Sequence, residues 1–187
     1  MKIVQAPHPV LSQKAKPVAT FDTAITHLVH EMEKTLDTAT DPEGVGLAAP
    51  QVGKSLQLFI VKQTPRSPLL TFINPKIEKV FDAPPEEPSP ASEKKTKRKG
   101  VQLEGCLSLK DVWGVVKRYH GIVLSYQDAT GKKHHQTFEG FIATIIQHEC
   151  DHLEGFLFTK RVLEQKNQLY RSVRNADGET EFEEIAL

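Results

Sequence analysis

The sequence predicts an α+β fold, with short mixed or antiparallel sheets packed around one central helix. Two segments have the 3.6-residue spacing of apolar side chains that is typical of a helix with one buried face, and short strand-like runs lie between them. These runs do not alternate with helices as βαβ units, which favours α+β over a parallel α/β sheet. They cover residues 56–61, 69–73, 77–81, 115–117, 122–126 and 134–138.

The helix predictions rest on capping residues and apolar spacing. Asp22 stands where an N-cap belongs, and the apolar residues after it share one face, which predicts a helix over 22–38. Those apolar residues are Ile25, Leu28, Val29, Met32 and Leu36. Further helices are predicted over 141–153 and 163–173, and residues 128–131 read as a hairpin turn.

Length and charge indicate one globular domain over residues 1–187. The chain contains 24 Lys and Arg and 24 Asp and Glu, so its net charge gives no reason to expect nucleic-acid or membrane binding. No apolar run approaches the roughly 18 residues that a transmembrane helix needs. The N-terminus has no apolar signal-peptide core, so we expect a cytoplasmic protein.

Residues 83–100 differ in composition from the rest of the chain. They contain four prolines and the basic run KKTKRK, but no large apolar residue. Such a segment cannot bury enough surface to offset the entropy lost on ordering it. We interpret it as a mobile loop between two strands, whose basic half is either solvated or contacts RNA or another acidic surface.

The segment His148-Glu149-Cys150-Asp151-His152 has the spacing of a metal site. Positions i and i+4 lie on the same face of a helix, so His148 and His152 can reach one metal ion. Glu149 is rotated by about 100° from His148, close enough to act on the water at the metal without binding the metal itself. The alternative is a polar helix face with two unengaged histidines.

A hydrolytic metal site needs a third protein ligand. Zinc proteases with this motif supply it downstream, but the two usual positions hold Phe158 and the segment 171–173, which offer none. The candidate is therefore Cys106, which follows Gly105 and lies upstream. Cys150 is the competitor, but it points about 200° around the helix from His148 and is expected to pack in the core.

Three blocks of sequence together resemble the signature motifs of peptide deformylases. They are GVGLAAPQ at 44–51, EGCLS at 104–108 and HECDH at 148–152. The resemblance covers roughly residues 3–170 and includes Ile73-Asn74-Pro75. The 83–100 segment is longer and more charged than we expect for the family.

The resemblance implies a catalytic domain that removes the N-formyl group from the formyl-methionine of newly made polypeptides and releases formate. It implies one divalent metal ion, most typically Fe²⁺, with Zn²⁺, Ni²⁺ or Co²⁺ as alternatives, held by Cys106, His148 and His152. The substrate also implies work close to the ribosome, near the exit tunnel.

The resemblance also assigns the catalytic groups. Glu149 would take the proton of the attacking water and pass it to the departing amine. The side-chain amide of Gln51 and the backbone N–H of Leu107 would stabilise the oxyanion that forms at the formyl carbon.

Substrate contacts are expected from the glycine-rich loop and from the ligand face of the motif helix. Val45 and Gly46 would line the peptide, where a small residue permits close approach. Phe141, Thr144 and Ile145 lie one to two turns before His148 and would form the floor of a methionine pocket. For Phe141, ordinary core packing is an equal alternative.

Two supporting contacts are expected around the ligands. A ligating histidine needs a partner for its second ring nitrogen, and Glu104 is the candidate. The resemblance implies that Asp151 pairs with Arg118.

The chain departs from the family pattern at two positions after the cysteine motif. The family usually shows a proline where this chain has Lys110, and often an arginine or tyrosine where it has Trp113. This loop borders the substrate entrance, so we expect an effect on specificity or affinity rather than loss of activity.

Two other functions were weighed. A metal-dependent endopeptidase would need a downstream ligand that this chain lacks. A ribosome-associated binding protein with a vestigial site would be favoured by loss of Glu149 or Gln51, and both are present.

Overall fold

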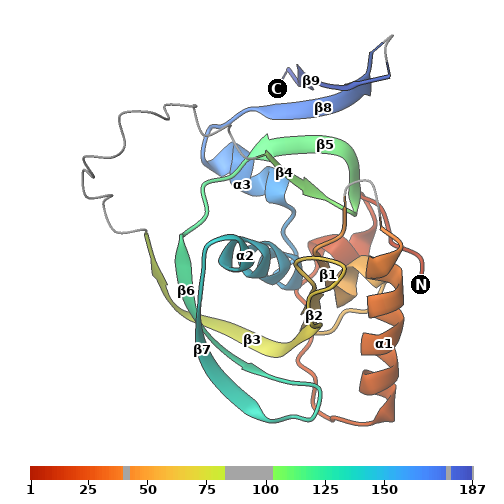
Figure 1. The fold of residues 1–187 in the computed structure, drawn as a ribbon, viewed down its shortest axis with the longest axis vertical. Coiled ribbons are helices and arrows are strands. Elements are labelled where there is room, and N and C mark those ends of the chain that lie inside the picture. The colour runs from red at the N-terminus through yellow and green to blue at the C-terminus, as the bar shows by residue number, and fades with distance from the viewer. Residues whose placement is uncertain (40–42, 83–102, 176–177, 187) are drawn as a thin grey trace.

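The computed structural model describes residues 1–39, 43–82, 103–175 and 178–186. Within them the chain forms two antiparallel sheets, one with the order β1-β2-β3-β6-β7 and one with the order β4-β5-β8-β9 (Figure 1). This mixed arrangement confirms the predicted α+β fold. The strands are β1 Gly46–Ala48, β2 Leu58–Val61, β3 Leu70–Phe81, β4 Leu103–Cys106, β5 Leu109–Val115, β6 Gly121–Gln127, β7 Lys133–Glu139, β8 Leu169–Arg174 and β9 Thr180–Glu184, and the α-helices are α1 Thr23–Asp37, α2 Phe141–Leu153 and α3 Phe158–Glu164.

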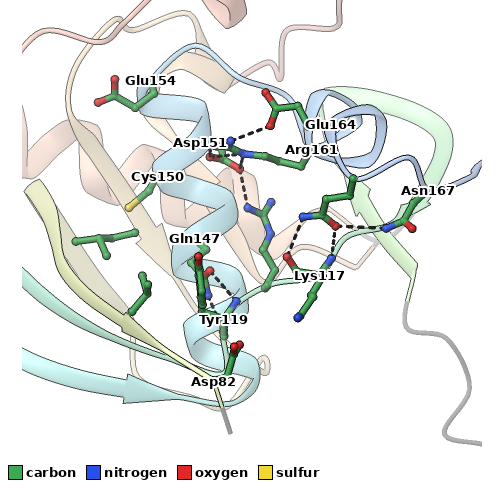
Figure 2. Close-up of a pocket in the computed structure, with 14 residues that line it drawn as sticks. Asp82, Lys117, Tyr119, Gln147, Cys150, Asp151, Glu154, Arg161, Glu164 and Asn167 are labelled. Carbon is green, nitrogen blue, oxygen red and sulfur yellow. Dashed lines mark hydrogen bonds and ion pairs between the residues drawn. The ribbon is translucent and has the colours of Figure 1, made fainter.

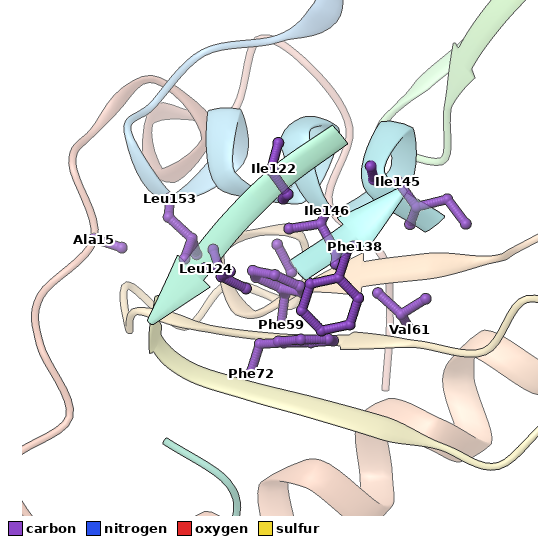
Figure 3. Close-up of a cluster of buried hydrophobic side chains, with 12 residues drawn as sticks. Ala15, Phe59, Val61, Phe72, Ile122, Leu124, Phe138, Ile145, Ile146 and Leu153 are labelled. Atoms are coloured by element: carbon purple, nitrogen blue, oxygen red, sulfur yellow. The ribbon is translucent and has the colours of Figure 1, made fainter. Parts of the chain in front are cut away.

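Helix α2 lies at the centre, with the five-stranded sheet curving around it (Figure 1). Its bounds match the predicted helix 141–153, and its buried face carries Ile145 and Ile146. These side chains belong to one apolar cluster with Phe59 of β2 and Phe72 of β3, whose stacked rings have centroids 4.8 Å apart (Figure 3). Burial against this sheet fixes the position of the helix that carries the HECDH motif.

Helix α1 covers the opposite face of the same sheet. Along β2, Phe59 and Val61 face α2, while Leu58 and Ile60 pack in a second cluster with Met32 of α1. This alternation is the period of two expected of a strand buried on both faces. The helix begins where predicted, because the Asp22 carboxylate accepts hydrogen bonds from the backbone N–H groups of the first turn.

The four-stranded sheet packs against α3 through a smaller apolar cluster. Gly114 of β5 permits this close packing, since a β-carbon there would lie 2.6 Å from Val162 of α3. Cys106 at the end of β4 belongs to the same cluster. Both β4 and β1 are edge strands of their sheets, so each has one side free of strand partners within the described residues.

The N-terminal arm holds two of the motif segments together. Val4 N–H donates to the carbonyl of Gln51 at 2.8 Å, and Ala6 N–H donates to the carbonyl of Ser108 at 2.9 Å. These two acceptors lie in the first and second motif segments. The arm therefore fixes segments that are more than fifty residues apart in sequence.

The predicted helix over 163–173 is wrong. The chain instead ends α3 at Glu164, takes a left-handed turn at Lys166 (φ 56°) and forms β8. Leu163, the first apolar residue of the predicted helix, lies near the end of α3 and is 50% exposed. The pairing of β8 with β5 and β9 overrides the local helical pattern.

Two strand predictions also need correction. The runs 69–73 and 77–81 form one long strand, β3, which continues through an irregularity at Asn74, where φ is 51°. The run 115–117 begins where β5 ends, because the strand itself covers Leu109–Val115. The strands at 122–126 and 134–138 and the turn between them are confirmed.

None of the helices among the described residues is long and apolar enough to cross a membrane. The predicted loop over 83–100 lies outside the described residues.

Candidate metal centre and substrate cleft

The structure brings Cys106, His148 and His152 together. Helix α2 places the two histidines one turn apart on one face, and β4 delivers the cysteine from the other sheet. Their ligand atoms lie within 4.8 Å of one another, and the Cys106 Sγ is 3.2 Å from the His152 Nε2. Cys150 lies instead on the back of α2, partly buried against the central core (Figure 2).

Glu149 lies buried between the histidines and β1. A β-carbon at Gly46 would collide with its carboxylate, so the glycine permits this close approach. Within the described residues, the buried Oε2 of Glu149 has no hydrogen-bond partner. Burial raises the pKa of Glu149 to about 7, because the charged form loses its hydration.

The Gln51 side chain is aimed at the cysteine. Its Oε1 accepts a hydrogen bond from Ala48 N–H at 2.8 Å, which fixes the orientation of the amide, and its Nε2 lies 3.5 Å from the Cys106 Sγ. Leu107 follows Cys106 in the turn between β4 and β5, and its carbonyl accepts a hydrogen bond from the Gln5 side chain. Gln51 and Leu107 therefore both lie next to Cys106, although they come from different segments of the chain.

A chain of buried charges supports His148. Its Nδ1 lies 2.7 Å from the Glu104 Oε1, and Arg118 contacts the same carboxylate through Nε and Nη2 at 3.0 and 2.7 Å. Burial would raise the pKa of Glu104, but hydrogen bonds from His148 and Arg118 outweigh it and lower the pKa to about 2. An ionised Glu104 can only accept, so His148 Nδ1 carries the proton of this hydrogen bond, and Nε2 is the ring nitrogen that Glu104 leaves unengaged.

Arg118 also holds the expected contact with Asp151, at 2.6 Å. Sequence reasoning missed a second arginine, Arg161 of α3, whose Nη2 lies 2.6 Å from the other oxygen of Asp151 (Figure 2). No sequence motif marks Arg161. Only the packing of α3 against α2 brings it to this carboxylate.

A cleft of about 660 Å³ opens beside these residues. The five residues predicted to contact substrate all line it, and Phe141 is 47% exposed at its wall, which argues against simple core packing. The cleft extends further than predicted, along the edge of β4. Its walls include Val45, Gly46, Phe141, Thr144, Ile145, and also Leu103, Trp113 and Gln63.

A thiol and two imidazoles around one point, beside a buried carboxylate and an open cleft, define the class of metal-dependent hydrolases. The sequence model of a family described as "Polypeptide deformylase" matches residues 1–168 of this chain. The chain belongs to the peptide deformylase family and is an enzyme of that family.

Individual relatives agree with this assignment. A peptide deformylase of Desulfotalea psychrophila is 36% identical over 171 residues, covering 91% of this chain and 92% of the relative. One of Rhizobium meliloti is 35% identical, covering 89% and 87%. The crystal structure of a peptide deformylase from Legionella pneumophila has a TM-score of 0.71 at 32% identity, covering 86% and 84%. A structure from Synechococcus elongatus in complex with actinonin has a TM-score of 0.71 at 33% identity, covering 86% and 78%.

Proposed function

We propose that this protein removes the formyl group from the N-terminal formyl-methionine of nascent polypeptides and releases formate. The observation that supports this most directly is the meeting of Cys106, His148 and His152 beside Glu149. The family assignment gives the reaction, and the geometry gives each residue a role in it.

The donor set suits one divalent metal ion. One sulfur and two imidazole nitrogens lie close enough to share an ion, and three protein ligands leave a position for water in a four-coordinate site. We propose Fe²⁺ as the native ion, with Zn²⁺, Ni²⁺ or Co²⁺ as alternatives, because this donor set accepts all of them. Such an ion, when bound, lowers the pKa of water and polarises the formyl carbonyl.

Glu149 is proposed as the proton carrier. Its pKa of about 7 lets the carboxylate accept a proton from the attacking water near neutral pH and return it as acid to the departing amine. Its Oε2 is free of protein hydrogen bonds among the described residues, so it is available for this work.

Gln51 and Leu107 are proposed to stabilise the oxyanion. Ala48 holds the Gln51 Oε1, which turns the Nε2–H donors toward the position beside Cys106. The backbone N–H of Leu107 would donate from the neighbouring turn. Donors fixed before the reaction need no reorganisation when charge develops.

The substrate is proposed to lie extended between the edge strands β1 and β4. Val45 and Gly46 border the peptide on one side, and Gly46 makes room for the Glu149 carboxylate beside it. Phe141, Thr144 and Ile145 of α2 would receive the methionine side chain. Glu104, Arg118 and Asp151 would hold His148 in its ligating orientation.

Three further proposals concern the domain, its location in the cell and its place of action. We propose one catalytic domain over residues 1–187, a cytoplasmic location, and action near the ribosomal exit tunnel, because formylated N-termini emerge there. Cosedimentation of the protein with ribosomes would test the last point.

The direct test is anaerobic purification with metal analysis and a formate assay. We expect about one divalent ion per chain, formate release from formyl-Met peptides, and no cut at internal peptide bonds. Acetyl-Met peptides should react far more slowly, because the extra methyl group crowds the carbonyl. Cleavage of unformylated peptides at internal bonds at a comparable rate would contradict the proposal.

A further inference from the structure

We propose that Trp113 selects the residue that follows methionine in the substrate. Its indole, held by Phe182, forms an aromatic subsite for a large apolar side chain at this second position. This inference rests on the deformylase function proposed above. It concerns the preference among formylated substrates rather than the reaction itself.

Trp113 lies directly beside the metal centre. It stands opposite Gly105 in the pairing of β5 with β4, and Gly105 precedes Cys106. A β-carbon at Gly105 would come within 2.8 Å of two carbons of the indole, so the ring lies against the glycine backbone. Any larger residue at position 105 would displace the indole from the edge of β4.

Trp113 lies on the outer face of its sheet. Gly114, the next residue, faces Val162 of α3, and side chains alternate along a strand, so Trp113 faces away from α3. Trp113 nevertheless lines the same cleft as Gly46 and Ile145. The cleft therefore passes around the edge of β4, from the helix side to the outer face of the sheet.

An extended substrate bound along the edge of β4 would place its side chains on both faces of the sheet. Successive side chains of an extended chain point in opposite directions. If the methionine side chain enters the pocket beside Ile145, the next side chain points to the outer face, where Trp113 lies. An apolar side chain at this position would cover the indole and lose contact with water.

Phe182 fixes the indole in place. The two rings meet edge to face, with centroids 5.8 Å apart and planes at 84°. Phe182 stands opposite Ser172 of β8, whose small side chain leaves room for the rings to meet above the intervening strand. Phe182 is 45% exposed on β9, so this contact lies at the surface of the sheet and not in a closed core. An indole restricted in this way loses little freedom on binding.

The first test is a series of formyl-Met-X peptides with Gly, Leu or Phe at the second position. We expect kcat/KM of the wild type to be about three- to tenfold higher for Phe than for Gly, the range given by one aromatic contact. In Trp113→Ala this ratio should fall to about one, through a higher KM at similar kcat. Trp113→Phe should keep part of the preference, and Phe182→Ala should weaken it.

The matched control is Tyr119→Ala. Tyr119 is a 48% exposed aromatic residue that lines the separate cavity behind α2, so its loss should leave the Phe-to-Gly ratio unchanged. Retention of the wild-type ratio in Trp113→Ala would overturn the proposal. If Trp113→Ala fails to fold, an unchanged ratio in both Trp113→Phe and Phe182→Ala would overturn it equally.

A second readout does not depend on turnover. Trp113 is the only tryptophan of the chain, so the intrinsic fluorescence reports on this ring alone. Titration of the zinc-loaded protein with Met-Phe product peptides should shift the emission to shorter wavelength, and Met-Gly peptides should shift it less. Equal shifts for both peptides would count against the subsite. Absence of formate release from every peptide would instead refute the proposed function.

Discussion

At the residue scale, consecutive residues of α2 face different neighbours and have different roles in the site. On α2, His148 faces Glu104, Glu149 lies against β1, and Cys150 is on the back of the helix. One turn of helix thus supplies a candidate metal ligand, a buried carboxylate and a core residue. Substitutions at neighbouring positions should therefore have separable effects.

The two cysteines give the clearest separation. Cys106→Ala should abolish tight metal binding, because it removes the sulfur that lies among the histidine nitrogens. Cys150→Ala is the matched control and should bind metal normally, since its thiol packs against the core. Metal analysis of both purified variants checks this. Equal metal content in wild type and Cys106→Ala would contradict the ligand assignment.

Glu149→Ala should keep the metal and the fold but lose most of the activity. This carboxylate is the proposed proton carrier, and it lies beside Cys106, His148 and His152 without being one of the clustered donors. Loss of general acid–base catalysis typically lowers the rate by about 10²- to 10⁴-fold. The measurement is kcat for formyl-Met peptides together with metal content. Activity within a few-fold of wild type would exclude Glu149 as the proton carrier.

Sequence reasoning could find these residues because their spacing is local. The i and i+4 histidines and the neighbouring glutamate follow from helix geometry alone. The contact of Arg118 with Asp151 was expected only through the family resemblance. Arg161 was missed, because its position beside Asp151 depends on how α3 packs, which no local pattern encodes.

At the element scale, helices with a cap and one apolar face were predictable, and strands that depend on distant partners were less so. The helix 141–153 has the predicted bounds, and α1 lies within the predicted 22–38. The error at 163–173 arose because β8 exists only through its pairing with β5 and β9. Local spacing cannot show such pairing.

The cap of α1 offers a test at this scale. Asp22→Ala should lower the free energy of unfolding by about 0.5–2 kcal/mol, because two N–H groups of the first turn lose their acceptor. Asp22→Asn is the matched control, since asparagine caps equally well, and should change it little. Both variants should keep wild-type activity. Urea unfolding measures the effect, and equal loss in both variants would point to charge rather than capping.

At the scale of the whole molecule, one ion-pair network joins the four-stranded sheet, the connection between the two sheets, and two helices. Glu104 of β4 and Asp151 of α2 meet at Arg118, which lies between β5 and β6, and Asp151 also meets Arg161 of α3. The cluster proposed to hold the metal comes from β4 and α2. The network therefore fixes the relative position of the two elements on which the ligand cluster depends.

Arg118→Met tests this connection. The Arg118 side chain is 8% exposed and its partners 12% and 10%, so the substitution leaves two buried carboxylates without this cation. Breaking a buried pair in this way typically costs about 3–5 kcal/mol of folding stability. Because Glu104 also holds His148, metal affinity should fall as well.

The matched control is Arg161→Met. Its side chain is 33% exposed and Asp151 keeps Arg118, so the cost should be about 1 kcal/mol or less, with metal binding retained. Urea unfolding of both variants, with and without added metal, measures stability and affinity together. A smaller cost for Arg118→Met than for Arg161→Met would show that α3, and not the contact between β4 and α2, carries the stabilisation.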